Sequence, residues 1–230
     1  MRAIIIITFF LLVNIFKSSG QSRGSYNMWY QYFLSAKISS KSNIIALSQY
    51  RSYDFIYDTR LFLGLTYVDY EIVKGVRPGV GFMYLLLRSY PEDDKDLIRY
   101  EKRPFQQVML AGDIGRVGII HRFRAEERFL NNPDQFILRL RYLISINIPF
   151  YKVGQDEKFY GIFKNEIRIN VRNERAFDSN RITGGAGWRL SKKWAIEANL
   201  VAQLDEGSSS NYGAIVARNF LDWRKKNKNQ

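Results

Sequence analysis

The chain has 230 residues, of which 46% are hydrophobic, 15% aromatic and 25% charged, a composition typical of one ordered domain. It contains no cysteine and a single histidine, His121, so we expect no disulfide, no metal and no cofactor. The formal net charge of +13 would favour nucleic acid as the partner of a cytoplasmic protein, but the first residues argue against that compartment.

Residues 1–20 have the pattern of a signal peptide. A positive start at Arg2 precedes the apolar stretch 3–16, and small residues end at Gly20. The alternative is an uncleaved anchor, but the stretch is shorter than the ~20 residues that a membrane-spanning helix needs. We therefore expect residues 1–20 to be removed on export and residues 21–230 to form the folded domain. That domain has no apolar run of helical length, so it could enter a membrane only as strands.

Alternation of apolar and polar residues predicts β-strands through this domain. Candidate strands lie at 26–37, 42–52, 59–69, 75–90, 98–111, 115–130, 136–150, 159–171, 181–190, 194–204 and 211–222. The clearest is 136–150, where every even-numbered residue from Phe136 to Phe150 is apolar or aromatic, and Arg139 and Arg141 lie between them. Asn165 departs from the pattern, because it falls on the apolar side of its strand. Eleven candidates conflict with the even strand number of bacterial single-chain barrels, so we expect ten or twelve strands.

These features predict an all-β protein: a single antiparallel up-and-down transmembrane β-barrel of about 10–12 strands in the cell outer membrane. The connector 191–193 is short, whereas 91–97, 172–179 and 205–211 are longer and polar, as in outer-membrane barrels. Several candidate strands exceed the ~5–6 residues usual in soluble proteins. Aromatic residues suited to the membrane interfaces are Trp29, Tyr142, Phe150, Trp188 and Trp194. The alternative is a secreted, water-soluble β-barrel or β-sandwich that binds a ligand.

Charged residues recur on the polar faces of neighbouring candidate strands. The candidate lumen network comprises Arg122, Arg124, Glu126, Arg128, Arg139, Arg141, Lys164, Glu166 and Arg168. One interpretation is a salt-bridge lattice that fills the lumen, completed by carboxylates such as Glu101 and Glu197. The second is an open, basic constriction that favours anions. We favour the lattice, because unpaired charges inside a narrow barrel are costly.

His121 shares the outer face of its strand with Ile119 and Phe123. A membrane-embedded lipid-modifying enzyme would need a serine on the same face of an adjacent strand, to act as a nucleophile. The following strand has apolar residues on that face, and the preceding segment FQQVMLAGD contains no serine. We therefore expect no catalytic residue and no enzymatic activity.

Several stretches together resemble the family called domain of unknown function 2490, a Bacteroidetes-type family of outer-membrane β-barrels. They are SQYRSYDF (48–55), EKRPFQQVML (101–110), HRFRAEERFL (121–130), FILRLRYLISINIPF (136–150) and DSNRITGGAGWRLSKKWAIEANL (178–200). The chain departs from the family pattern at KNEIRIN (164–170) and in its charged C-terminal tail. The resemblance implies an architecture and a location in the Gram-negative envelope, but no activity and no site residues.

Two main hypotheses describe the molecular role. The first is binding or passage of a small anionic or glycan-like solute through a charged lumen. The second is a structural or interaction role, with a sealed lumen and contacts to outer-membrane lipid or lipopolysaccharide. Nucleic acid is not an expected partner, and the pattern of residues does not predict an oligomeric state.

Overall fold

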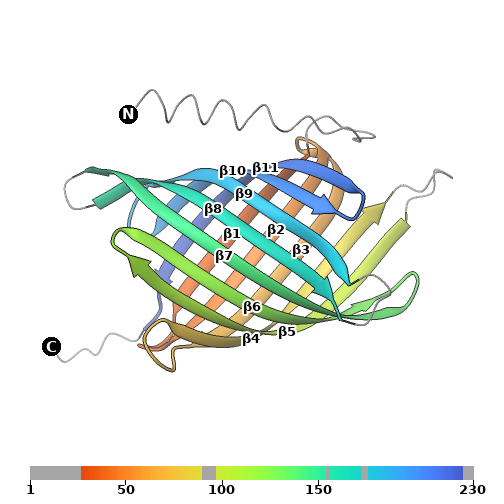
Figure 1. Cartoon of the computed structure of the whole chain (residues 1–230), viewed down its shortest axis with the longest axis horizontal. Coiled ribbons are helices and arrows are strands. Elements are labelled where there is room, and N and C mark those ends of the chain that lie inside the picture. The colour runs from red at the N-terminus through yellow and green to blue at the C-terminus, as the bar shows by residue number, and fades with distance from the viewer. Residues whose placement is uncertain (1–26, 90–96, 154–155, 172–175, 225–230) are drawn as a thin grey trace.

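The chain folds into a closed β-barrel (Figure 1). The computed structural model describes residues 27–89, 97–153, 156–171 and 176–224, and the expected signal peptide lies outside them. The strands are β1 (Met28–Lys37), β2 (Ser42–Asp54), β3 (Tyr57–Tyr70), β4 (Val76–Ser89), β5 (Leu97–Ile114), β6 (Val117–Leu130), β7 (Gln135–Val153), β8 (Asp156–Asn170), β9 (Phe177–Arg189), β10 (Trp194–Asp205) and β11 (Ser208–Asp222). Nowhere in these ranges is there a helix long and apolar enough to cross a bilayer. The all-β, up-and-down barrel predicted from the sequence is confirmed.

The barrel closes through a parallel pair of strands. Each strand pairs antiparallel with its neighbour in sequence, but β1 and β11 run parallel, from Met28 opposite Gly213 to Lys37 opposite Asp222. The expectation of an even number, ten or twelve, was wrong, since the described residues form eleven strands, one for each candidate. In an up-and-down meander of odd number the first and last strands point the same way, so only a parallel seam can close it.

The two ends of the barrel carry different connections. We call the end where β1 begins the N-terminal mouth; it carries the connections β2–β3, β4–β5, β6–β7, β8–β9 and β10–β11, at the right of Figure 1. The opposite end is the C-terminal mouth.

The prediction of a long loop at 205–211 was wrong, because β10 and β11 are joined by Glu206 and Gly207 alone. Gly207 has a φ of 77°, which glycine adopts without strain. The serine-rich sequence that suggested a loop belongs to a strand at the mouth.

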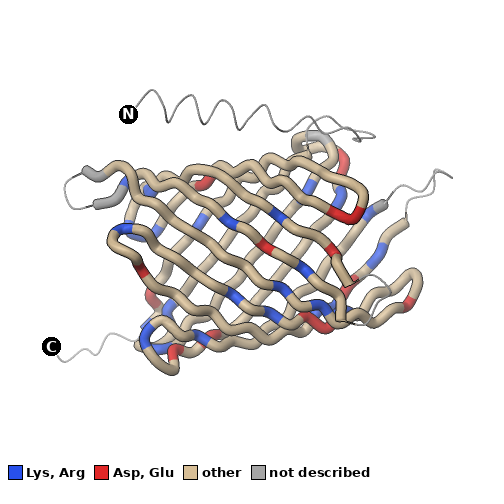
Figure 2. The backbone as a smooth tube through the Cα atoms, in the orientation of Figure 1, with Lys and Arg blue, Asp and Glu red and all other residues tan. Residues whose placement is uncertain are grey.

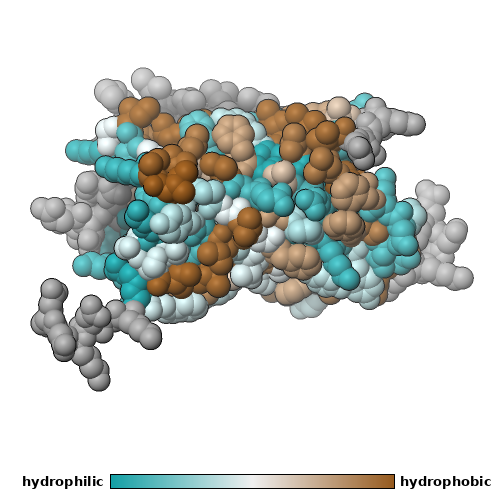
Figure 3. Space-filling model, turned by 90° about the horizontal axis from the view of Figure 1, so that it is seen from below, coloured by the Kyte–Doolittle hydropathy of each residue, from teal (hydrophilic) through white to brown (hydrophobic). Residues whose placement is uncertain are grey.

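The two faces of the wall differ in polarity as the alternation predicts. Leu140 and Leu200 point outward and are 46% and 58% exposed, whereas Arg139 and Glu126 point inward and are buried. Figure 3 shows apolar side chains gathered in patches on one side of the outer wall. The exceptional Asn165 also points outward, and its side-chain amide donates a hydrogen bond to Asn180 Oδ1 at 2.8 Å. The two amides thus satisfy part of each other's hydrogen-bonding capacity on an apolar surface.

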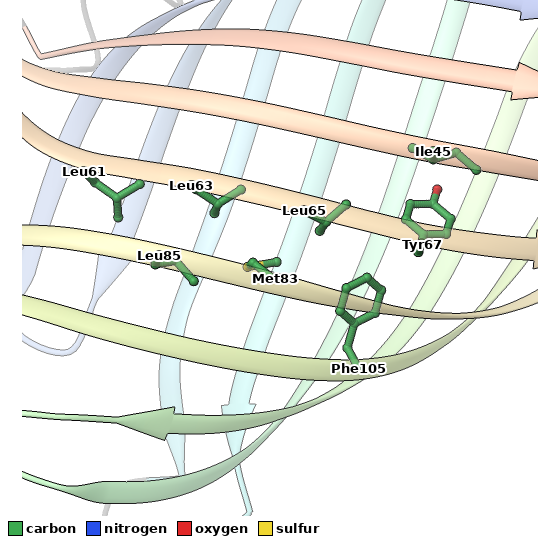
Figure 4. Packing of buried hydrophobic residues seen from close by; sticks show 8 residues of the cluster. All are labelled: Ile45, Leu61, Leu63, Leu65, Tyr67, Met83, Leu85 and Phe105. Atoms are coloured by element: carbon green, nitrogen blue, oxygen red, sulfur yellow. The ribbon is translucent and has the colours of Figure 1, made fainter.

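Part of the interior is apolar. One buried cluster, drawn in Figure 4, lines the barrel from β2 to β5 and consists of Ile45, Leu61, Leu63, Leu65, Tyr67, Met83, Leu85 and Phe105. Space for its aromatic rings depends on Gly81, where an added Cβ would lie 2.3 Å from Tyr67 Cβ and 2.6 Å from Phe105 Cζ. The inner face is therefore largely apolar in this part of the wall, although Asp69 of β3 binds Arg77 of β4 at 2.5 Å, and most of the ionic interior lies from β5 to β11.

The parallel seam predicts which cysteine pairs form disulfides. Tyr30 lies opposite Ile215 and Leu34 opposite Asn219, on the outer face. We expect both double-cysteine variants to cross-link, because adjacent strands bring such Cα atoms within disulfide range. The natural chain has no cysteine to interfere. The readout is a reduction-sensitive shift in electrophoretic mobility.

A mismatched pair, cysteines at Tyr30 and Asn219, is the control and should remain reduced. In an antiparallel seam only one of the two matched pairs could lie in register, so cross-linking of just one pair would contradict the topology.

Candidate functional site: an ionic lattice in the lumen

The nine residues of the candidate network lie on the inner faces of three consecutive strands. Alternation turns the even-numbered charges of β6 and β8 and the odd-numbered charges of β7 into the lumen. In Figure 2 the basic and acidic positions of these strands follow one another across the wall. The register places Arg124 opposite Arg141, and Arg141 opposite Arg168, in a row of like charges. Such a row is unfavourable by itself, so its neighbours must offset it.

Glu126 is the carboxylate at the centre of the lattice. Its side chain is 0% exposed and has three guanidiniums around it. Arg141 Nη1 lies 2.5 Å from Oε1, Arg103 Nη1 lies 3.5 Å from Oε2, and Arg124 Nη1 lies 3.6 Å from Oε1. Arg103 comes from β5, so Glu126 links the strands β5, β6 and β7. Removal of this one carboxylate would leave several buried cations without their shared partner.

Glu166 is the second shared carboxylate. Arg141 Nη2 lies 2.7 Å from its Oε2, and Arg122 Nη2, from β6, lies 2.7 Å from its Oε1. Arg141 therefore bridges Glu126 and Glu166, and each of its terminal nitrogens donates to a different carboxylate. The charge-assisted hydrogen bonds of this planar fork offset the repulsion along the arginine row.

Further carboxylates extend the lattice to both sides. Glu101 binds Arg103, with Nε 2.5 Å from Oε1, and also binds Arg128. Glu197 accepts hydrogen bonds from Arg218 Nε at 2.5 Å and from the Tyr160 hydroxyl at 3.1 Å. Lys164 Nζ, from the predicted set, lies 3.9 Å from Glu197 Oε2.

Asp178 completes the lattice from a position that alternation does not predict. Even-numbered side chains of β9 point outward, yet Asp178 Oδ1 lies 2.6 Å from Arg139 Nη2. The register shifts here, with Arg168 opposite Ser179 and Ile169 opposite Phe177, so Asp178 has no partner across the ladder. A bulge of this kind re-aims a side chain. Sequence reasoning has no signal for it.

Neutral groups support the remaining cations. Arg124 donates from Nε and Nη2 to Gln107 Oε1 at 3.0 and 2.7 Å, and its Cζ lies 4.2 Å from the centre of the Phe105 ring. Arg103 and Gln107 were absent from the predicted set, although they share the odd-numbered inner face of β5 with Glu101. Extending the alternation by one strand would have found them.

Two glycines make room for the lattice on β9. An added Cβ at Gly187 would lie 2.1 Å from Tyr160 Cζ, and one at Gly185 would lie 2.2 Å from Asn199 Oδ1. Tyr160 therefore lies over Gly187, where its hydroxyl reaches Glu197. Gly185 and Gly187 thus leave space for neighbouring side chains, whereas an added Cβ at Gly184 would meet nothing within 4 Å.

His121 lies outside the lattice. It points outward, and its Nδ1 lies 2.9 Å from the hydroxyl of Tyr142; its direct neighbours across the ladder are Leu110 and Ile144. No cluster of three metal-binding side chains occurs in the part of the chain that the structure describes.

The position predicted for Trp29 was wrong: we expected it in an aromatic girdle, but it points into the lumen and is 5% exposed.

The fold and the lattice define a class: a small closed β-barrel with an ionic interior. Residues 26–213 match the family described as protein of unknown function (DUF2490), and the chain belongs to this family. No curated protein matches the chain.

Glu126→Ala should lower the free energy of unfolding by about 3–5 kcal/mol, because it leaves buried guanidiniums uncompensated. Chemical unfolding followed by tryptophan fluorescence measures this change.

Glu127→Ala is the matched control, since Glu127 is the next residue and lies on the opposite face of β6. Its effect should stay within ~0.5 kcal/mol. Equal effects of the two variants would contradict the central position of Glu126 in the lattice.

Proposed function

We propose that the protein is an outer-membrane β-barrel of the Gram-negative envelope with a closed lumen. In this proposal the chain is exported by its signal peptide and acts as a structural or interaction protein whose outer wall contacts lipid and lipopolysaccharide. A pore and a lipid-modifying enzyme are the competing functions.

The distribution of polarity carries the proposal. The wall turns large apolar side chains outward, where Phe123, Trp188 and Leu200 are 51%, 49% and 58% exposed. It buries charge inside, where Glu126 is 0% and Arg124 5% exposed. A water-soluble protein gains stability from the reverse arrangement. An apolar outer wall around a polar interior is what a bilayer requires of a barrel.

Aromatic side chains near both mouths support the same proposal. Towards the C-terminal mouth the exposed aromatic residues are Phe150, Tyr151, Phe159, Trp188 and Trp194, and towards the N-terminal mouth they are Tyr100, Phe129, Phe136 and Phe177. Some of them contact one another: the rings of Phe159 and Trp188 are stacked at 6.0 Å, and those of Phe129 and Phe136 lie 5.1 Å apart. Such girdles are typical of strands that cross the two interfaces of a bilayer.

Contacts across the interior favour a closed lumen over a pore. Arg60 of β3 donates a hydrogen bond to the hydroxyl of Tyr212 of β11 at 3.4 Å. Arg181 of β9 lies with its Cζ 5.0 Å from the centre of the Trp29 ring of β1. Two strands separate the partners in each case, so these side chains reach across the barrel. Together with the lattice they place side chains across the space that a solute would have to pass.

The same arrangement disfavours nucleic-acid binding and lipid hydrolysis. Much of the positive charge points into the lumen, where a nucleic-acid duplex cannot reach it. His121 has a tyrosine hydroxyl beside it and apolar side chains across the ladder on either side. A serine nucleophile next to this histidine is what a hydrolase would need.

Leu200→Arg distinguishes a membrane barrel from a water-soluble one. Leu200 lies at the middle of β10 and points outward. In a bilayer an arginine there should cost about 2–4 kcal/mol, whereas on a soluble surface the change should stay within ~0.5 kcal/mol. The measurement is unfolding in lipid vesicles, after fractionation and a heat-modifiability gel of the native protein.

Leu204→Arg is the matched control, because Leu204 has the same orientation one residue before the end of β10. Near the interface its cost should fall to about 0–1 kcal/mol. Recovery of the native protein in the soluble fraction, or equal effects of the two variants, would contradict the membrane proposal.

The closed lumen predicts that the purified barrel carries no steady ionic current in a planar bilayer, because ion pairs and packed side chains occupy its interior. A porin reconstituted in the same bilayers is the positive control. Steady anion-selective conductance of the wild-type protein would refute the closed lumen and favour the basic constriction.

A further inference from the structure

Three arginines near the N-terminal mouth differ in their partners from the other cations of the lumen: Arg168, which belongs to the predicted network, and Arg51 and Arg181, which do not. Arg51 of β2 and Arg181 of β9 both approach the inward-pointing Trp29, with their Cζ atoms 4.0 and 5.0 Å from the centre of its ring. Tyr212 lies beside Trp29, with the ring centres 4.6 Å apart. Trp29 thus holds two guanidiniums from distant strands in one region of the lumen.

Arg168 of β8 is the third member of this group. It is 6% exposed, yet its Nε and Nη2 atoms have no hydrogen-bond partner among the described residues. The carboxylate of Asp178 lies 3.8 Å from Nε, beyond hydrogen-bonding distance, and Arg139 already binds that carboxylate at 2.6 Å. A buried guanidinium with two unused donors is costly unless another acceptor is supplied.

The remaining two arginines have only neutral hydrogen-bond partners in the described part of the chain. Arg51 donates from Nε and Nη2 to Gln49 Oε1 at 3.0 and 2.8 Å, and Arg181 donates from Nε to Gln203 Oε1 at 2.8 Å. Neither glutamine neutralises charge. The hydrogen bonds of Arg51 and Arg181 therefore leave their positive charges without a carboxylate partner.

The three cations also repel one another in a closed cycle. Arg168 repels Arg51, Arg181 repels Arg168, and Arg51 repels Arg181. Glu166 attracts Arg168 and Arg181 more weakly, and its own hydrogen bonds go to Arg122 and Arg141. The group is thus arranged to accept an anion.

We infer that Arg51, Arg168 and Arg181 form a binding site for a phosphoryl group. Guanidinium forks match the geometry of phosphate oxygens, which can accept two parallel hydrogen bonds from each fork. A phosphomonoester carries about −1.5 to −2 charges at pH 7, more than a carboxylate or a chloride supplies to three cations. The aromatic rings of Trp29 and Tyr212 lie beside these arginines.

The three arginines lie near the ends of their strands at the N-terminal mouth. Arg51 lies three residues before the end of β2, Arg168 two residues before the end of β8, and Arg181 four residues after the start of β9. Arg51 and Arg181 are partly exposed, whereas Arg168 is buried. The inference does not depend on a membrane around the barrel, and a site at one mouth is compatible with a closed lumen.

Arg168→Gln tests the site in the purified full-length protein. Titration calorimetry with inorganic phosphate should give one site on the wild type and at least a tenfold weaker affinity for the variant, while chloride at equal ionic strength gives no signal. Without phosphate, the variant should unfold at a higher temperature than the wild type, because a repelled cation has been removed. A purely structural role of Arg168 predicts the opposite shift.

Arg189→Gln is the matched control. It makes the same change of charge at the C-terminal end of β9, the strand of Arg181, where Arg189 lies over Tyr160 and far from the three arginines. It should bind phosphate like the wild type. Equal loss of affinity in both variants would mean that phosphate responds only to overall charge, and would overturn the inference.

A second titration distinguishes a soluble phosphate from a lipid headgroup as the natural ligand. If the natural ligand is soluble, inorganic phosphate alone should protect the wild type from thermal unfolding. If the group belongs to a lipid, phosphatidic acid in mixed micelles should protect the wild type but not Arg168→Gln, and phosphatidylcholine should protect neither. Absence of protection and of heat in every titration would refute the site.

Discussion

A guanidinium inside a barrel this narrow has little water to bind, so it must find a carboxylate, an amide or an aromatic ring. The lumen contains more arginines than carboxylates, and the carboxylates are therefore shared. Glu126 lies among three guanidiniums and Glu166 binds two, with Arg141 bridging them. Three features of the fold make this sharing possible. The register and the bulge at Asp178 bring carboxylates close to the guanidiniums, and the inner glycines of β9 leave space for the side chains of the lattice.

The interior is also divided by chemistry. From β2 to β5 the inner face carries mainly leucines and aromatic rings, and from β5 to β11 it carries the lattice. The two regions meet at β5, where Phe105 packs in the apolar cluster and lies beneath the guanidinium of Arg124. An arginine offers its flat face to a ring while its edges donate hydrogen bonds, so it can join an apolar wall to an ionic one.

Alternation predicted much of this fold, because a period of two is a local property that a strand keeps in any barrel. It located eleven strands, the outward direction of Leu140 and the inward direction of Arg139. It could not show which strands close the barrel, since the parallel pairing of β1 and β11 joins residues that are distant in sequence. The even-number rule was therefore the wrong guide. The prediction for Trp29 was also wrong. A tryptophan is typical of a membrane interface, but its odd-numbered position on β1 turns this side chain into the lumen.

For the candidate site, sequence reasoning found the charges and two further carboxylates of the lattice, Glu101 and Glu197, but not which cation each carboxylate binds. Arg122, Arg128 and Arg141 follow from alternation, whereas their pairing depends on register and on side-chain reach across two strands. Asp178 shows the limit most clearly, because a single shifted register reverses the face that its number predicts. The grouping of Arg51, Arg168 and Arg181 likewise becomes visible only when the strands β2, β8 and β9 are placed together.

The parallel seam has a consequence for sidedness. An even-stranded meander returns its chain to the side from which it started, and both ends of the domain then share a compartment. Here Met28 begins β1 at one mouth and Asp222 ends β11 at the other. The first and last residues of the barrel wall are therefore separated by the full length of the barrel, and any layer around the wall would lie between them.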